Sequence, residues 1–126
     1  TPLIVASREN QPEIIEFLLE KGANIDASDN ERQTPLILAV RLDLQEIVHI
    51  LLKRGANPNL CTGPQNKTPL MFAIENDHKE IFELLLQHNA SVCYPDLRLR
   101  TPLMYAAEEG RDHFLPPLLE KGARIQ

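Results

Sequence analysis

Apolar residues recur along this chain in two alternating kinds of block. One kind is a short, almost uninterrupted apolar run, as at residues 36–40. The other spaces its apolar residues at helical intervals, as at residues 47–52. Apolar residues three and four positions apart lie on one face of a helix and bury that face against a neighbour. The pattern therefore predicts pairs of short helices separated by polar turns.

One sequence signal marks the beginning of every pair. A Thr-Pro-Leu triplet recurs at steps of 33, 34 and 33 residues, beginning at Thr1, Thr34, Thr68 and Thr101. Threonine caps the free N–H groups of a first helical turn, and proline suits the first helical position. Each triplet therefore predicts the start of the first helix in a pair.

A second signal marks the end of every pair. Two leucines and two polar residues are followed, in the four units, by Gly22, Gly55, Asn89 and Gly122. Glycine, and next to it asparagine, tolerates the left-handed conformation that ends a helix. Helix pairs this short cannot bury their apolar faces alone, whereas a stack of them can. We therefore predict one all-α domain over residues 1–126, a solenoid with repeats 1–33, 34–67, 68–100 and 101–126, the last incomplete or atypical.

The whole chain resembles the ankyrin repeat family. The resemblance rests on the Thr-Pro-Leu triplets, on the Leu-Leu-x-x-Gly-Ala segments, and on alanines in the first helices, namely Ala6, Ala39, Ala73 and Ala106. It implies an ankyrin-repeat α-solenoid of about four helix-turn-helix repeats with short β-hairpin or turn loops. It also implies a non-catalytic scaffold, adaptor or recruiting domain within a larger intracellular protein, either cytoplasmic or nuclear.

The chain departs from the family's pattern in its loops and in its last helix. The family usually has glycine two residues before the threonine, where this chain has Arg32, Asn66 and Leu99. Positive φ is costly for arginine and leucine, so we expect those two turns to differ from the family's. The loop before Thr68 is one residue longer than the usual period. Interior proline breaks a helical hydrogen bond, so we expect the last helix to kink or to restart at Pro116.

The resemblance implies a concave binding face formed by the hairpin tips and the exposed side of the first helices. The candidate partner-binding residues are Arg8, Glu31, Gln33, Arg41, Leu42, Lys67, Phe72, Glu75, Asn76, Leu97, Arg98, Arg100, Tyr105, Glu108 and Glu109. Their first-helix charges are basic in repeats one and two and acidic in repeats three and four. This arrangement favours a peptide or protein partner of mixed charge. The alternative interpretation is an ordinary solvated surface.

Some apolar candidates allow two interpretations. Val5, Leu38, Phe72 and Tyr105 form a row that serves either core packing or partner contact. We expect Tyr105 to be the contact, because a tyrosine hydroxyl prefers a wet edge. The leucines at positions 97 and 99 either form an exposed hot spot or fold back under the adjacent hairpin tip.

Composition and motifs narrow the function classes. The net charge of −5 argues against nucleic-acid binding and against adhesion to anionic membranes. No window is long and apolar enough to predict membrane insertion. The four histidines show no HExxH or paired metal spacing, and no Gly-rich phosphate loop occurs. We therefore expect no catalysis, no cofactor and no metal. The Asp-His pairs at 77–78 and 112–113 are expected at helix starts, where acidic residues favour the helix dipole.

Three further expectations concern the setting and modification of the chain. Cys61 and Cys93 lack CxxC spacing and are expected to be reduced thiols in an intracellular protein. Asn59 matches the loop position at which some intracellular ankyrin repeats are hydroxylated. The first repeat has no polar capping face, so we expect a monomeric module within a longer polypeptide. Besides the interaction module, a structural spacer array and an inhibitor of a bound enzyme stay open.

Overall fold

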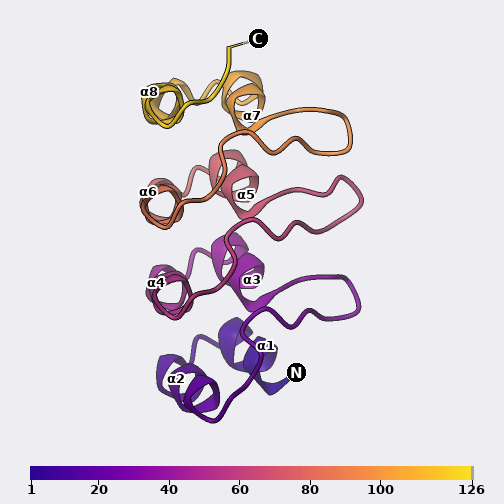
Figure 1. Ribbon diagram of the computed structural model, residues 1–126, viewed down its shortest axis with the longest axis vertical. Helices are drawn as coiled ribbons and strands as arrows, with labels where there is room; N and C mark the ends of the chain where they lie inside the picture. The colour runs from indigo at the N-terminus through magenta and orange to yellow at the C-terminus, as the bar shows by residue number, and fades with distance from the viewer. Residues whose placement is uncertain (126) are drawn as a thin grey trace.

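A computed structural model describes residues 1–125 of the chain. The helices are α1 (Pro2–Arg8), α2 (Pro12–Glu20), α3 (Pro35–Arg41), α4 (Gln45–Lys53), α5 (Pro69–Glu75), α6 (Lys79–Gln87), α7 (Pro102–Glu108) and α8 (Leu115–Glu120). The helix pairs stack along the long axis of the molecule. The odd-numbered helices form an inner row, the even-numbered helices form an outer row, and the long loops project beyond the inner row (Figure 1). The all-α solenoid expected from the sequence is confirmed.

The inner helices start where the Thr-Pro-Leu triplets predict. In each repeat the threonine hydroxyl accepts a hydrogen bond from the backbone N–H three residues later, at 3.2–3.4 Å. Proline occupies the first turn of all four helices, where its missing N–H leaves no acceptor unsatisfied. The triplet thus determines where each inner helix begins through contacts within one turn, independently of the packing between repeats.

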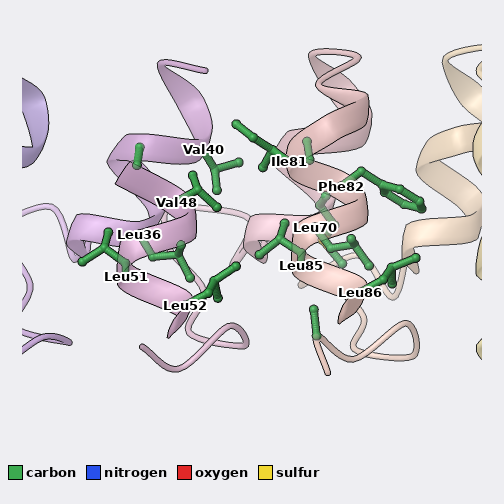
Figure 2. Close-up of a cluster of buried hydrophobic side chains, with 14 of the residues drawn as sticks. Leu36, Val40, Val48, Leu51, Leu52, Leu70, Ile81, Phe82, Leu85 and Leu86 are labelled. Atoms are coloured by element: carbon green, nitrogen blue, oxygen red, sulfur yellow. The ribbon is translucent and has the colours of Figure 1, made fainter. Parts of the chain in front are cut away.

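The apolar core lies between successive helix pairs. Figure 2 shows Ile81 and Leu85 pointing from α6 toward the preceding pair, whose Val48 and Leu52 point toward them. All four side chains are buried. The next interface continues the pattern with a contact between Phe82 and Phe114, whose ring centroids are 4.5 Å apart.

One position repeated along the stack shows how much burial depends on the neighbouring repeat. Ile47 and Ile81 hold equivalent places in α4 and α6, and both have 0% exposure. Ile14 holds the same place in α2, where the structure contains no preceding repeat, and it is 49% exposed. The same side chain in the same local structure is therefore buried only when an adjacent repeat covers it.

The loops before α3, α5 and α7 are hairpins, which we call the first (residues 29–33), second (62–67) and third (96–100) hairpin. The expectation that Arg32 and Leu99 change their turns is wrong. They adopt φ of 63° and 64°, close to the 54° of Asn66 in the second hairpin. The reason is an aspartate at the start of the first and third hairpins. Asp29 accepts N–H bonds from residues 31 and 33, and Asp96 accepts them from residues 98 and 100, at 2.8–2.9 Å.

The second hairpin contains the additional residue and closes differently. Thr62 and Lys67 form an antiparallel bridge with two backbone hydrogen bonds of 2.9 Å. Within residues 1–125 this isolated bridge is the extent of β-pairing, so the loops are hairpins without a sheet.

The last outer helix breaks at its prolines. A 3₁₀ turn spans Asp112–Phe114, and α8 begins at Leu115, one residue before the predicted restart at Pro116. Pro116 and Pro117 therefore lie in the first turn of α8, where backbone N–H groups have no intrahelical acceptor. Phe114 and Leu118 stay buried across the break, so the fourth pair keeps its packing against the third.

Replacement of Leu99 by glycine tests the strain in the third hairpin. Leu99 is 74% exposed, so its side chain contributes little burial. A left-handed conformation costs a side chain ~1–2 kcal/mol, which exceeds the extra entropy of glycine in the unfolded chain. We expect Leu99→Gly to raise the free energy of unfolding by about 0.5–1 kcal/mol in urea denaturation. Leu97→Gly is the matched control, because Leu97 is also exposed but lacks positive φ. A gain of equal size in the control contradicts this account.

Candidate functional site

The predicted partner-binding residues lie along the hairpins and inner helices, and they differ in exposure. Nine are exposed, namely Arg8, Glu31, Arg41, Leu42, Asn76, Leu97, Arg98, Glu108 and Glu109. Five are half-buried, namely Gln33, Lys67, Phe72, Glu75 and Arg100. Tyr105 alone among the candidates is buried. We call the side of the molecule that carries the hairpins and inner helices the hairpin side (Figure 1). It presents most of the candidate residues to solvent.

A repeated contact joins each hairpin to the inner helix that follows it. The last hairpin residue bonds to the residue eight positions later. Lys67 Nζ donates to both carboxylate oxygens of Glu75 at 2.9 and 2.8 Å. Arg100 Nη1 lies 3.0 Å from Glu108. In these two pairs a carboxylate neutralises a cation that the sequence alone would leave unpaired at the surface.

In the second repeat the same contact has a different character. Arg41 Nη1 donates to the side-chain carbonyl of Gln33 at 2.6 Å, so the partner of this cation is a neutral amide. Gln33 in turn donates to Glu31 at 3.0 Å. The positive charge of Arg41 therefore has no carboxylate partner at the surface, whereas Lys67 and Arg100 are each paired with a glutamate.

Cations and aromatic rings alternate along this side of the stack. The Arg41 guanidinium lies 5.4 Å from the centre of the Phe72 ring, and Lys67 Nζ lies 5.6 Å from it. Lys67 also lies 5.7 Å from the ring of Tyr105, which Arg100 approaches at 4.7 Å. A cation within about 6 Å of a ring face is attracted to it. These cation–ring contacts hold the long side chains of Arg41, Lys67 and Arg100 in defined places.

Tyr105 does not place its hydroxyl at a wet edge, so that interpretation is wrong. The residue is 2% exposed, and its hydroxyl donates to the carboxylate of Asp96 and accepts a 3.2 Å bond from Arg100. The buried Asp96 carboxylate requires donors, and the tyrosine supplies one of them. In the free chain Tyr105 therefore organises the third hairpin and offers no contact surface. Val5, in the same row, is exposed, and Leu38 is buried.

Burial and hydrogen bonding shift the pKa values of both Asp96 and Tyr105. Burial would raise the pKa of Asp96, but hydrogen bonds from the Tyr105 hydroxyl and from the backbone N–H groups of Arg100 and Arg98 outweigh it and lower that pKa. Burial raises the pKa of Tyr105 far above its usual range, and the hydrogen bond to Asp96 adds to the rise. At neutral pH the pair is a carboxylate and a neutral phenol.

A groove of about 590 Å³ opens between the first and second hairpins. Residues 30–33 of the first hairpin and 62–65 of the second form its walls, and Arg41, Lys67 and Phe72 complete the lining. The two hairpins are tied together beside it. The Thr62 hydroxyl donates to the Glu31 carbonyl at 2.9 Å, and Arg32 donates to the Gly63 carbonyl at 2.9 Å.

The third hairpin exposes its leucines. Leu97 and Leu99 are 63% and 74% exposed, so the alternative in which they fold back under the adjacent tip is wrong. The contact between the tips is made by the backbone instead, since the Leu97 N–H donates to the Gln65 carbonyl at 2.9 Å.

The histidines of the two Asp-His pairs bond to the preceding repeat and not to the aspartate beside them. His113 bonds to Asp77 of the preceding repeat at 2.7 Å, and His78 Nδ1 bonds to the Val40 carbonyl at 2.9 Å. Arg111, at the equivalent place in repeat four, donates to the Ile74 carbonyl at 3.2 Å. These bonds link successive repeats. Among residues 1–125 no three His, Cys, Asp or Glu side chains are grouped to hold a metal ion.

Asn59 belongs to a ladder of hydrogen bonds between the loops that follow the outer helices. Its side-chain carbonyl accepts the Ser91 N–H at 2.8 Å, and Asp26 accepts the Asn57 N–H in the preceding step at 3.0 Å. The hydroxylation of Asn59 stays a prediction, and the ladder implies that a modifying enzyme must open this loop.

Comparison with known proteins gives one family. A model for ankyrin repeats, built on three copies of the repeat, matches residues 1–62 and again residues 59–126. No curated protein matches the chain. Within residues 1–125 no helix is both long and apolar enough to span a membrane.

Replacement of Tyr105 by phenylalanine tests the buried carboxylate. The change removes a hydroxyl donor from Asp96, so its pKa should rise toward the usual range. A carboxylate with a lowered folded pKa stabilises above its unfolded pKa of about 4, and this contribution is lost as the pH falls through the folded pKa. We expect Tyr105→Phe to cost about 1–2 kcal/mol of unfolding free energy near neutral pH and less below about pH 4.

Urea denaturation across that pH range, with an NMR titration of Asp96, measures both effects. A stability difference that does not change with pH, together with an unchanged Asp96 pKa, contradicts this role.

The modification of Asn59 is tested by mass spectrometry. After incubation with an asparaginyl hydroxylase, the peptide containing Asn59 should gain the mass of one oxygen atom. It should gain it faster in a Ser91→Pro chain, which lacks the N–H donor that Asn59 accepts. Absence of the added oxygen in both chains rejects the site.

Proposed function

Because this chain belongs to the ankyrin repeat family, whose members are in general non-catalytic protein-interaction modules, we propose that it holds a peptide or protein surface on its hairpin side. In this proposal the chain is a scaffold, an adaptor or a recruiting domain. It acts as a monomeric module within a larger chain, and the bound partner carries whatever chemistry the assembly performs.

The observation that carries the proposal is the groove between the first and second hairpins. It combines a half-buried aromatic ring with exposed and half-buried cations on adjacent repeats. Binding sites in proteins commonly join an apolar floor to a few oriented polar groups. The outer helices α4 and α6 present scattered charged side chains, such as Glu46, Lys53 and Glu83.

The orientation of the surface side chains supports the same proposal. Arg41 and Lys67 are held over Phe72, and Lys67 is further fixed by Glu75. Side chains that are ordered before binding lose less entropy when a partner arrives. Charges in such a face set partner choice and association rate more than affinity.

An intracellular setting is part of the proposal. Cys61 and Cys93 are both free thiols, which suits a reducing compartment. Cell fractionation with an antibody to this chain tests the setting, and recovery from the secreted fraction alone rejects it.

Charge exchange on two faces tests where the partner binds. The hairpin-side variant carries Arg41→Glu and Glu109→Lys, and the control carries Lys53→Glu and Glu83→Lys on the outer helices. All four residues are exposed, and each double exchange leaves the net charge unchanged. Partners from a cell lysate are cross-linked and quantified by mass spectrometry. We expect the control to retain them and the hairpin-side variant to recover at least about tenfold less, as when central contacts are removed from an interface.

Equal recovery by both variants rejects the hairpin side as the binding face. If no chain recovers any partner, the structural spacer is favoured. A recovered enzyme whose activity falls when the chain is added identifies an inhibitor instead of a recruiting domain.

A further inference from the structure

The groove between the first and second hairpins has the opposite charge to the molecule as a whole. Its lining contains three cations, Arg32, Arg41 and Lys67, and one carboxylate, Glu31. The complete chain carries a net charge of −5. A concave patch whose charge opposes that of its surroundings concentrates ligands of the complementary sign. The groove therefore favours an anionic ligand.

Two of these three cations lack a carboxylate partner. Glu75 neutralises Lys67 through both carboxylate oxygens. Arg41 bonds to the amide of Gln33, and Arg32 bonds to a backbone carbonyl and to the Asn66 amide. Among residues 1–125 neither guanidinium lies within 4.0 Å of a carboxylate.

The geometry around Arg41 prepares it for a carboxylate. Its guanidinium lies 5.4 Å from the Phe72 ring centre and is held at one nitrogen by Gln33 at 2.6 Å. A planar guanidinium has five N–H donors, so most of them stay available for a ligand. Arginine binds carboxylates through paired parallel hydrogen bonds, which lysine cannot form.

The rest of the lining indicates what accompanies the carboxylate. Pro64 and Phe72 supply apolar surface beside the cations. A free small anion would leave this surface uncovered, whereas a peptide with an apolar side chain next to an acidic one uses both parts.

We propose that this groove binds an acidic segment of a partner protein, with an aspartate or glutamate carboxylate on Arg41 and a neighbouring apolar side chain against Pro64 and Phe72. The proposal rests on the proposed function as a protein-binding module and names the chemistry that its partner presents. Arg32, whose partners are a backbone carbonyl and an amide oxygen, supplies further positive potential beside Arg41.

Selection from a displayed library of random short peptides, followed by a double-mutant cycle, tests the proposal. The strongest binder is labelled with a fluorophore and titrated by fluorescence polarisation, and each of its acidic residues is changed in turn to the corresponding amide. The chain is used as wild type and as Arg41→Gln. Arg54→Gln is the matched control, because Arg54 follows α4 in the outer row and pairs with Glu16 and Glu20. Thermal melts verify that both variants fold.

We expect the selected peptides to be enriched in Asp or Glu beside an apolar residue. One acid-to-amide change and Arg41→Gln should each weaken binding about tenfold, and together no more than either alone, as for a close charge pair. Arg54→Gln should leave the affinity unchanged.

Selected peptides without acidic residues, or an acid-to-amide effect that Arg41→Gln leaves intact, overturn the proposal. Failure to select any peptide also overturns it. In each of these cases the charge-exchange experiment still decides whether the hairpin side binds a protein, so the two failures are distinguishable.

Discussion

Burial of apolar side chains between successive helix pairs is the constraint on which the rest of this structure depends. No pair covers its own apolar face, and three equivalent isoleucines make this visible. Ile47 and Ile81 are fully buried by the repeat before them, while Ile14 is half exposed where the structure contains none. Burial of a large aliphatic side chain contributes about 1.5–3 kcal/mol, so each interface stabilises both of its members. The fold is therefore a sum of neighbouring contacts.

The stack also determines where the surface groups lie. Its repeat places one hairpin beside the next, close enough for Thr62 to donate to the Glu31 carbonyl and for Arg32 to donate to the Gly63 carbonyl. It brings Arg41 of α3 over Phe72 of α5, although the two residues are far apart in the sequence. The groove and its charge are consequences of this register. A change that shifts one interface should therefore alter the proposed binding face without replacing any residue on it.

Much of this architecture follows from local sequence signals, and the exceptions have identifiable causes. The Thr-Pro-Leu triplets predict the inner helices because capping and proline placement act within one turn. The turns at Arg32 and Leu99 could not be predicted from their own residue types, because Asp29 and Asp96 control them from the hairpin start. An aspartate five residues before the threonine is the signal that could have indicated this.

The proposed binding surface was less predictable than the fold. The sequence locates charged positions on the hairpin side, but it does not show which charges pair with one another. The Lys67–Glu75 and Arg100–Glu108 pairs depend on the distance between a hairpin and the helix that follows it. The buried hydroxyl of Tyr105 likewise finds its acceptor in Asp96 of the third hairpin. Only the three-dimensional arrangement distinguishes Arg41, with its neutral partner, from the neutralised cations beside it.

We propose that the hairpin side is the surface at which this chain meets its partner. Site-specific photo-cross-linking in cells tests this most directly, with a benzoyl-phenylalanine placed at position 30 in one chain and at position 53 in another. Asn30 is exposed and lines the groove beside Arg41, so its replacement leaves the proposed carboxylate contact in place. We expect a cross-linked partner from position 30, on the groove, and none from position 53, on the outer helices. A partner captured from position 53 and absent from position 30 would contradict the proposal.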